Sequence, residues 1–390
     1  MNQDISASPD FEFIVRLAAR GEGVTEDGRF VAMTAPGDRI GPDGAVTPGP
    51  HHQLPPCRHF PECGGCQLQH VDDAAYAGYL TDRIASALQA QGVPLPEIHP
   101  PHLSPPRTRR RATLKAAGGL VGFNAGASHR IVDMRECHIL HPALFALVAP
   151  LRRLLRGRAS ANMTLADQGA DLLLEGVRVE GLAATEAMIA FAQEQRLARL
   201  ALDDGYGPQT LWEPEPVTVT LSGVAVPLPH GAFLQATADG EAALVEAVRE
   251  AVAGATIVAD LFAGLGTFAL ALSGKVYAAE GGRDAVIALK AAGKGLFVDH
   301  RDLFRRPLDP SELDRFEAIV LDPPRAGAKE QAPHLAASSV PRIAYVSCNP
   351  ATFARDARLL VDGGYRLLWI QPVGQFRWAT HVELVGAFAR

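Results

Sequence analysis

The stretch Asp260-Leu-Phe-Ala-Gly264-Leu-Gly266-Thr267-Phe268 joins a strand-like run, 256–260, to a segment that is predicted to be a helix. Glycines at such a junction let a ligand approach the backbone, and a helix N-terminus offers free N–H groups. The next strand-like run ends at Glu280, which is placed to accept hydrogen bonds from ribose hydroxyls. A nucleotide or S-adenosylmethionine satisfies both features, and the order G-x-G-x-x-A also permits NAD.

Strands and helices alternate from residue 233 to residue 390. Helices are predicted at 239–253 and 283–293, and strands are predicted at 275–280, 296–300, 316–321, 342–347, 365–371 and 381–387. This alternation is typical of a doubly wound α/β sheet, which binds its ligands at the carboxyl ends of the strands. We therefore expect a Rossmann-like domain at 233–390.

Two further domains are expected before residue 233. Apolar and polar residues alternate around Asp27-Gly28, a hairpin signal, and predict a small β domain at 1–50. Predicted helices at 72–91 and 141–157, mixed with short strand-like runs, indicate a central α+β domain at 51–232. A length of 390 residues accommodates three domains.

The composition is that of a folded globular protein, with 47% hydrophobic and 21% charged residues. No apolar run is long enough to span a membrane, and residues 1–13 lack the basic start and apolar core of a signal peptide. We therefore expect a cytoplasmic protein without membrane contact, and the sequence indicates no obligate protein partner. The net charge of −6 does not indicate nucleic-acid binding, but arginines cluster at 107–111 and 152–158. Such clusters contact phosphates or form ordinary solvated surface.

Four of the five cysteines have a spacing that suits a metal site. Cys57, Cys63 and Cys66 share one loop, and Cys137 stands alone in Met134-Arg-Glu-Cys137-His. Cytoplasmic thiols stay reduced, so such a group holds metal more often than it forms disulfides. Four thiolates suit zinc or an iron–sulfur cluster, and the spacing does not choose between them.

The fifth cysteine, Cys348, follows a predicted strand and precedes a predicted helix in Val346-Ser-Cys348-Asn-Pro350. A thiolate there can add to C6 of a uracil ring, which makes C5 nucleophilic. This chemistry requires a low thiol pKa, which a helix N-terminus favours. A buried structural cysteine is the alternative. Glu383, on the same strand face as His381, is the candidate base for the C5 proton, and an exposed edge carboxylate is the alternative.

Asp322-Pro-Pro-Arg325 lies at another predicted strand end that faces the same crevice. The two prolines lack N–H groups, so the carbonyls and Asp322 stay free to bind a ligand. In methyltransferases that act on amino groups, an aromatic residue commonly follows such a pair. Arg325 in that place argues against methylation of an amino group.

Together these motifs resemble those of the bacterial RNA uracil-C5 methyltransferases, and the resemblance covers almost the whole chain. The motifs that carry it include Phe233-Leu-Gln235, Asp322-Pro-Pro-Arg-Ala-Gly327 and Ser347-Cys348-Asn-Pro. Cys57-x5-Cys63-Gly-Gly-Cys66 is similar to the iron–sulfur motif of the branch that methylates 23S ribosomal RNA. The resemblance implies a class I S-adenosylmethionine-dependent methyltransferase that forms 5-methyluridine in RNA, with 23S ribosomal RNA as the favoured partner.

The resemblance also implies roles for individual residues. Cys348 matches the nucleophile that forms a covalent adduct with uracil C6, and Glu383 matches the base. The S-adenosylmethionine contacts that it implies are Gln235, Phe262, Thr267, Glu280, Asp302 and Asp322. The ligands that it implies for a 4Fe–4S cluster are Cys57, Cys63, Cys66 and Cys137. The first domain resembles the small RNA-binding β-barrel of the TRAM type in truncated form.

The chain departs from the family pattern at several places, among them Ala292, where an asparagine is usual, and the short loop at 293–295. Thr237 stands where Gln-x-Asn is common, and Gly374-Gln-Phe-Arg-Trp-Ala-Thr replaces the usual Asp-x-Phe-Pro type of approach to His381. Three other functions stay open. One is methylation of the transfer RNA T-loop, which the cysteine motif disfavours. Another is a non-catalytic iron–sulfur protein of RNA binding or ribosome assembly, which the intact Cys348 and Glu383 disfavour. The weakest is a zinc protein methyltransferase that acts on glutamine.

Overall fold

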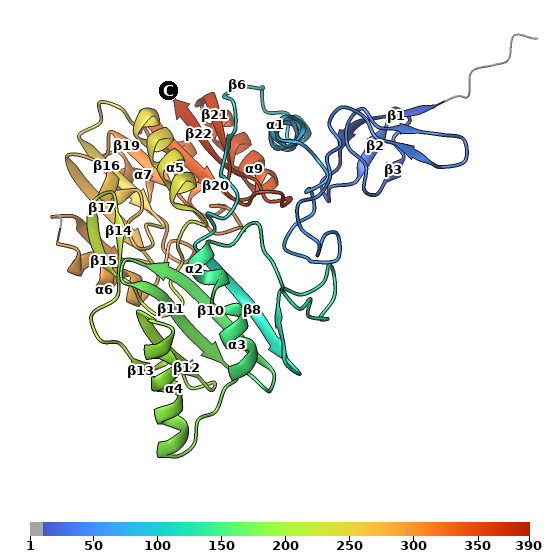
Figure 1. Cartoon of the computed structure of the whole chain (residues 1–390). Coiled ribbons are helices and arrows are strands. Elements are labelled where there is room, and N and C mark those ends of the chain that lie inside the picture. Colours follow the sequence, from blue (N-terminus) through green and yellow to red (C-terminus); the bar gives the residue numbers. More distant parts are fainter. Residues whose placement is uncertain (1–10, 294) are drawn as a thin grey trace, which may run out of the picture.

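The computed structural model describes residues 11–293 and 295–390, which form four β-sheets with helices around them (Figure 1). The segment 1–10, most of the stretch inspected for a signal peptide, lies outside the described residues. Among the helices that are described, none combines the length and the apolar character that crossing a membrane requires.

A nine-stranded sheet forms the C-terminal part of the fold. Its order is β18-β17-β16-β19-β20-β22-β21-β6, and β7 also pairs with β21. The five strands from β18 to β20 are parallel, whereas β22 runs antiparallel to both of its neighbours. The main strands are β16 (Ile257–Leu261), β17 (Lys275–Glu280), β18 (Phe297–His300), β19 (Ala318–Leu321), β20 (Arg342–Ser347), β21 (Arg366–Gly374) and β22 (Glu383–Ala389). The predicted doubly wound sheet is thus present.

Helices cover both faces of this sheet, because alternate strand residues point to opposite sides. Leu261 and Tyr345 belong to one apolar cluster with residues of the helices on that face, whereas Val258 and Val346 belong to a second cluster on the other face. The first cluster includes α1 (Asp73–Ala90), α7 (Pro310–Leu313), α8 (Ala332–Ala337) and α9 (Pro350–Asp362). The second includes α5 (Ala238–Ala251) and α6 (Arg283–Ala291).

Part of the segment between the cysteine loop and residue 107 joins the C-terminal sheet. Helix α1 packs on α9, and the short strands β6 (Glu97–Ile98) and β7 (His102–Leu103) run parallel to β21. The sequence pattern groups these elements with the central domain. In the fold they complete one edge of the sheet that carries the ligand-binding strand ends.

The prediction of a helix directly after the glycine loop is wrong. Only a single 3-10 turn, η1 (Ala269–Ala271), forms between Gly266 and β17. Few residues separate the loop from Lys275, so a longer helix has no room. The backbone N–H of Ala269 donates instead to the buried carboxylate of Asp260, at 2.8 Å, which ties the turn to the end of β16.

The central sheet has the order β13-β12-β11-β10-β8-β9, and its apolar face packs on α2 (Pro142–Phe145), α3 (Val148–Leu154) and α4 (Leu182–Glu194). Its strands are β8 (Arg111–Ala117), β9 (Leu120–Gly122), β10 (Ala159–Ala166), β11 (Gly169–Glu175), β12 (Arg199–Asp203) and β13 (Gln209–Trp212). A two-stranded sheet follows, made of β14 (Thr218–Leu221) and β15 (Val224–Pro227), and packs with α6.

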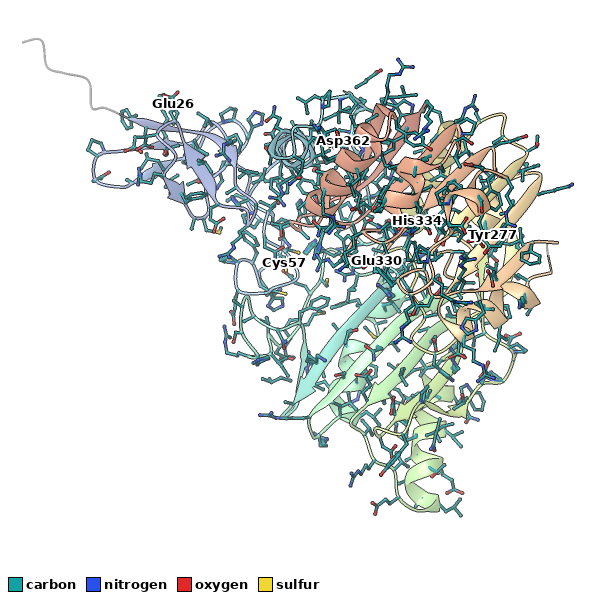
Figure 2. All side chains as sticks on the ribbon, turned by 180° about the vertical axis from the view of Figure 1, so that it is seen from behind. Glu26, Cys57, Tyr277, Glu330, His334 and Asp362 are labelled. Carbon is teal, nitrogen blue, oxygen red and sulfur yellow. The ribbon has the colours of Figure 1, made fainter. Side chains whose placement is uncertain are left out.

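The N-terminal sheet has the order β3-β2-β1-β4-β5 and is antiparallel throughout. Its strands are β1 (Glu12–Leu17), β2 (Gly23–Thr25), β3 (Phe30–Val31), β4 (Arg39–Ile40) and β5 (Val46–Thr47). The pairing of β2 with β3 confirms the hairpin expected at Asp27-Gly28. Cys57 lies where this sheet meets the rest of the chain (Figure 2).

Two glycine substitutions test the packing of α9 on the sheet. A Cβ on Gly386 in β22 would lie 2.5 Å from Cζ of the buried Phe353 ring, whereas a Cβ on Gly78 inside α1 would meet no atom within 4 Å. Gly386→Ala should therefore destabilise the protein by about 1–3 kcal/mol through overpacking. Gly78→Ala should stabilise it by roughly 0.5–1 kcal/mol. Urea unfolding midpoints measure both, and equal shifts of one sign would contradict this account of the contact.

Candidate functional site

A pocket of about 600 Å³ opens at the carboxyl ends of β16, β17, β19 and β20. Eight residues that the sequence singles out line it together, although they span almost 150 positions of the chain. They are Gln235, Phe262, Thr267, Glu280, Asp302, Asp322, Cys348 and Glu383. The doubly wound topology accounts for most of this convergence, because the loops after parallel strands all emerge at one edge of the sheet, whereas Glu383 reaches that edge from the start of the antiparallel strand β22.

The glycine loop and the acidic residue after the next strand are joined directly. Glu280 accepts hydrogen bonds from the backbone N–H groups of Gly264, at 2.8 Å, and of Gly282, at 2.6 Å. Phe262 has a φ of +66°, in the left-handed region, and its ring lies 5.4 Å from that of Phe304. This wall of the pocket combines a carboxylate with two aromatic rings, which suits a ribose and an adenine.

Strand pairing brings the candidate nucleophile and the candidate base together. Ser347 in β20 pairs with Leu384 in β22, so the same register continued by one residue places Cys348 opposite Glu383. The Glu383 side chain is buried, and the Cys348 side chain is half-buried. Both face Asp322, whose charge affects the pKa of each.

The low thiol pKa expected for Cys348 is wrong for the protein without ligands. Burial, followed by the negative charges of Glu383 and Asp322, raises the pKa of Cys348 to about 11. The helix after it does begin at Pro350, as predicted, but its dipole does not offset these effects. Burial and the charge of Asp322 likewise raise the pKa of Glu383 to about 8.

Arg325 is the cation of this group. Its guanidinium lowers the pKa of both Cys348 and Glu383, and its Nη2 lies 2.9 Å from Nδ1 of His381. Burial and the charge of Arg325 lower the pKa of His381, so a neutral imidazole accepts this hydrogen bond. The backbone oxygen of Arg325 is held by Asn349 and Thr352, at 3.1 and 3.2 Å.

Sequence reasoning missed Gln375, which follows β21 and is 1% exposed. Its side chain contacts the backbone of Ala236 and the side chain of Gln235, and it lowers the pKa of Glu383. The only signal was the departure from the family pattern at 374–380.

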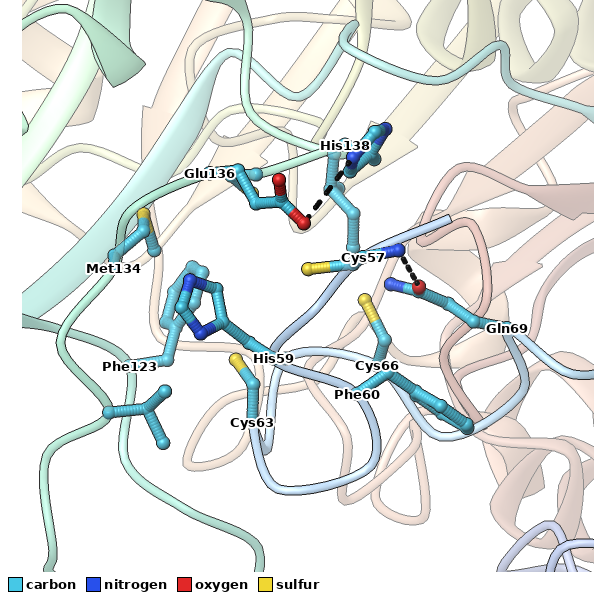
Figure 3. Close-up of a pocket in the computed structure, with 14 residues that line it drawn as sticks. Cys57, His59, Phe60, Cys63, Cys66, Gln69, Phe123, Met134, Glu136 and His138 are labelled. Carbon is cyan, nitrogen blue, oxygen red and sulfur yellow. Dashed lines mark hydrogen bonds and ion pairs between the residues drawn. The ribbon is translucent and has the colours of Figure 1, made fainter. Parts of the chain in front are cut away.

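The four remaining cysteines line a second, small cavity of about 20 Å³. The sulfur atoms of Cys57, Cys63 and Cys66 turn into this cavity, and Gln69 accepts from the backbone N–H of Cys57 (Figure 3). Burial raises the pKa of all four thiols, and backbone N–H groups lower it again at Cys57, Cys63 and Cys137. Within the described part of the chain, no three His, Cys, Asp or Glu side chains are arranged to hold a single metal ion.

Three arginines of the cluster at 107–111 make contacts within the fold. Arg110 pairs with Glu241 of α5 at 2.5 Å, and Arg109 packs against Phe123 and Phe376. Arg111 lies over the exposed ring of Phe233 at the mouth of the large pocket. The cluster is therefore a bridge between the central sheet and the pocket rather than a free row of cations.

Known proteins share this architecture and sequence. The family described as tRNA (Uracil-5-)-methyltransferase matches residues 297–388. An RNA methyltransferase of Zymomonas mobilis is 55% identical, over 97% of this chain and 99% of its own. A 23S rRNA (uracil(1939)-C(5))-methyltransferase RlmD of Chromohalobacter salexigens is 32% identical, over 97% of this chain and 88% of its own.

A solved structure has the same fold. The tRNA (uracil-54, C5)-methyltransferase of Pyrococcus abyssi, in complex with S-adenosyl-L-homocysteine, superposes with a TM-score of 0.73. It is 21% identical, and the match covers 97% of this chain and 100% of that one.

The pH dependence of Cys348 alkylation tests the electrostatics of the site. Because iodoacetamide reacts with the thiolate, the alkylation rate should rise with pH toward a midpoint near 11. Glu383→Gln removes a negative charge beside the thiol, so its midpoint should fall. Mass spectrometry of the Cys348 peptide measures the rate. Glu246→Gln, on the exposed side of α5, is the control and should keep the wild-type midpoint. A Glu383→Gln midpoint equal to that of the control would contradict the account.

Proposed function

The chain belongs to the S-adenosylmethionine-dependent RNA uracil-C5 methyltransferases, and we propose that it forms 5-methyluridine in 23S ribosomal RNA through a covalent Cys348–uracil adduct. The observation that carries this proposal is the opposition of Cys348 and Glu383 in the pocket that also contains the six proposed cofactor residues. Two features support the ribosomal target over transfer RNA: the four cysteines and the similarity to the 23S enzyme of Chromohalobacter salexigens.

In the proposed reaction, the Cys348 sulfur bonds to C6 of the uracil, and the electrons of the 5,6 double bond move toward O4. C5 then takes the methyl group that S-adenosylmethionine supplies, and S-adenosylhomocysteine is the product that leaves. Glu383 removes the proton from C5, and the bond between C6 and sulfur breaks to release 5-methyluridine. With a pKa raised to about 8, the Glu383 carboxylate has a high proton affinity once it is ionised, and the positive charge of a bound sulfonium would favour that ionised form.

The residues of the pocket fit S-adenosylmethionine. Glu280 keeps lone pairs free for ribose hydroxyls beyond its two backbone hydrogen bonds, and Phe262 and Phe304 offer ring faces. Asp322 faces Cys348 and Glu383 at the reacting end. Binding of the sulfonium cation near these carboxylates would lower the thiol pKa, which favours the thiolate.

The four clustered cysteines fit a 4Fe–4S cluster, and we propose that Cys57, Cys63, Cys66 and Cys137 bind one. In a 4Fe–4S cluster four thiolates each bind a different iron, and four cysteines line this cavity. Backbone N–H groups near Cys57, Cys63 and Cys137 partly offset the rise in thiol pKa that burial causes. Such a cluster would join the loop at 57–66 to Cys137.

RNA has a proposed path to the pocket along the polar face of β8. Arg111, Thr113 and Lys115 lie at alternate positions of β8 and therefore share one face of the strand. They line grooves that continue to His381 at the edge of the active site. We propose that this face holds the RNA backbone while the target base leaves its stack to reach Cys348. The N-terminal sheet, as a truncated TRAM-like module, would extend this surface.

Trapping experiments test the proposed function. Wild-type protein should introduce 5-methyluridine into 23S ribosomal RNA from a strain that lacks the enzyme. Cys348→Ala should introduce none, because no adduct can form. Glu383→Gln should add to uracil and transfer the methyl group but stall before loss of the C5 proton. A protein–RNA band that resists denaturing gels should therefore accumulate with Glu383→Gln and be absent with Cys348→Ala.

Glu246→Gln serves again as the control and should turn over without a trapped band. Normal turnover by both active-site variants, or loss of activity in both without any trapped RNA, would contradict the assigned roles. Methylation of transfer RNA alone would contradict the ribosomal target and leave the roles of Cys348 and Glu383 intact.

The cluster proposal predicts brown protein with about four irons per chain after anaerobic purification, because a 4Fe–4S cluster has four thiolate ligands. Cys137→Ala should lose most of this iron even though Cys137 lies far in sequence from the other three. Iron analysis and absorbance near 400 nm measure the loss. Cys348→Ala is the matched control and should keep its iron, since Cys348 lines the other pocket. One zinc per chain and no iron would overturn the proposal.

A further inference from the structure

Gln375 lies between the candidate base and Gln235, and all three of these side chains are buried. Their exposed fractions are 1% for Gln375, 3% for Gln235 and 6% for Glu383. The amide oxygen of Gln375 accepts from the backbone N–H of Ala236 at 2.8 Å, and its amide nitrogen lies 2.7 Å from Oε1 of Gln235. Val373 pairs with Glu383, so Gln375 lies two residues beyond that pair, and it lowers the pKa of Glu383.

These contacts fix the orientation of both amides. A backbone N–H can only donate, so the atom of Gln375 that faces Ala236 must be the oxygen. The nitrogen of Gln375 then faces Gln235, and because it can only donate, Gln235 must present its oxygen there. The amino group of Gln235 is consequently turned away from Gln375.

The amino group of Gln235 is a donor that lacks a hydrogen-bond partner among the described residues. Gln235 lines the same pocket as Cys348, and its Nε2 keeps access to solvent. The backbone of this residue is held in place, because Nε of Arg110 donates to its carbonyl at 3.1 Å. A fixed donor is thus available to a ligand at the end of the pocket where Glu383 lies.

We propose that Gln375 is a positioning residue that turns the amino group of Gln235 toward C4 of the target base and so makes the site select uracil over cytosine. This inference rests on the proposed function. Glu383 must reach the proton on C5, and C4 is the neighbouring ring atom, so a donor beside Glu383 lies near the group on C4. Uracil carries an oxygen there, which accepts a hydrogen bond, whereas cytosine carries an amino group, which donates one.

The same donor assists the first step of the reaction. When the sulfur of Cys348 adds to C6, negative charge develops on O4 of the uracil. A hydrogen bond from Gln235 is then stronger in the transition state than in the ground state, which lowers the barrier. Gln235 would therefore contact the substrate, while Gln375 would act through it.

Substitution of Gln375 separates this role from general stability. A carboxylate in Gln375→Glu can only accept, so it should reverse the Gln235 amide and present an oxygen to C4. Gln375→Met keeps the length of the side chain but removes its polarity, so the Gln235 amide is free to take either orientation. Gln371→Glu is the matched control, because Gln371 is a glutamine on the same strand that does not line the pocket.

The assay uses full-length protein that carries its native complement of metal. The uridine that wild-type protein methylates is first mapped in RNA from a strain that lacks the enzyme. Two transcripts of that region, with uridine or cytidine at the mapped position, then give the ratio of kcat/KM values. The ratio should fall by about tenfold or more in Gln375→Glu, since a buried hydrogen bond is replaced by a mismatch. It should fall less in Gln375→Met and stay unchanged in Gln371→Glu.

A wild-type ratio in Gln375→Met would overturn the inference, and this variant decides the matter if Gln375→Glu does not fold. Equal falls in Gln371→Glu and Gln375→Glu would overturn it as well. A different result would contradict the proposed function: wild-type protein would leave 23S ribosomal RNA unmethylated. The ratio is still measured then, on whichever uridine the wild-type protein marks.

Discussion

Two carboxylates and a thiol share one poorly solvated pocket, and this arrangement constrains the whole active site. Asp322, Cys348 and Glu383 each have a pKa raised by burial, and the last two are raised further by their acidic neighbours. Burial alone raises the pKa of Asp322 to about 7. Three groups that disfavour one another's charge keep the empty site largely protonated near neutral pH. Arg325 already lowers the pKa of Cys348 and of Glu383, and a bound sulfonium would add positive charge, so the proposed nucleophile would become reactive when its substrates are in place.

One topological feature creates this proximity. Strand β22 enters the sheet antiparallel between β20 and β21, so its first residue, Glu383, meets the last residues of β20. In an all-parallel sheet, the start of a strand would lie at the edge opposite to the ligand site. The antiparallel insertion brings a base from the start of one strand to the end of another. It also sets Gln375, just after β21, beside Glu383.

Regular alternation made much of this fold predictable from sequence. The bounds of β17 and β20 agree with the expected runs 275–280 and 342–347, and α1 and α9 begin where capping residues and prolines indicate. The eight residues singled out for the pocket also come together: most follow parallel strands, whose ends share one edge, whereas Glu383 depends on the antiparallel strand β22. Local patterns failed where the outcome depended on distant partners. No signal near Cys348 reveals that carboxylates from positions 322 and 383 oppose its ionisation.

Gln375 shows the same limit more sharply. A glutamine in a segment rich in aromatic residues has no motif, and its meaning arises only when Ala236 and Glu383 converge on it. The glycine loop failed for another reason, since its short span before β17 leaves room for one 3-10 turn only. Sequence reasoning therefore located the groups proposed to do the chemistry, whereas the groups that orient them depended on tertiary contacts.

The cysteine loop is physically attached to the segment that leads to the base. Backbone N–H groups of Gln67 and Leu68 donate to the carbonyl of Trp378, at 2.8 and 2.9 Å, and the indole packs with Cys66 and Ile139. Trp378 has a φ of +58°, a left-handed conformation that surrounding contacts must hold in a residue other than glycine.

Arg377 adds a second anchor, because it pairs with Asp73 of α1 and donates to the carbonyl of Ser104 at 3.1 Å. The segment 374–382 thus contacts the cysteine loop and α1. Gln375 lies near its start, and Glu383 follows its end. A cluster bound by the four thiolates would hold this segment in place without transferring an electron. Under the proposed function, the four cysteines would hold the backbone segment from which Glu383 projects.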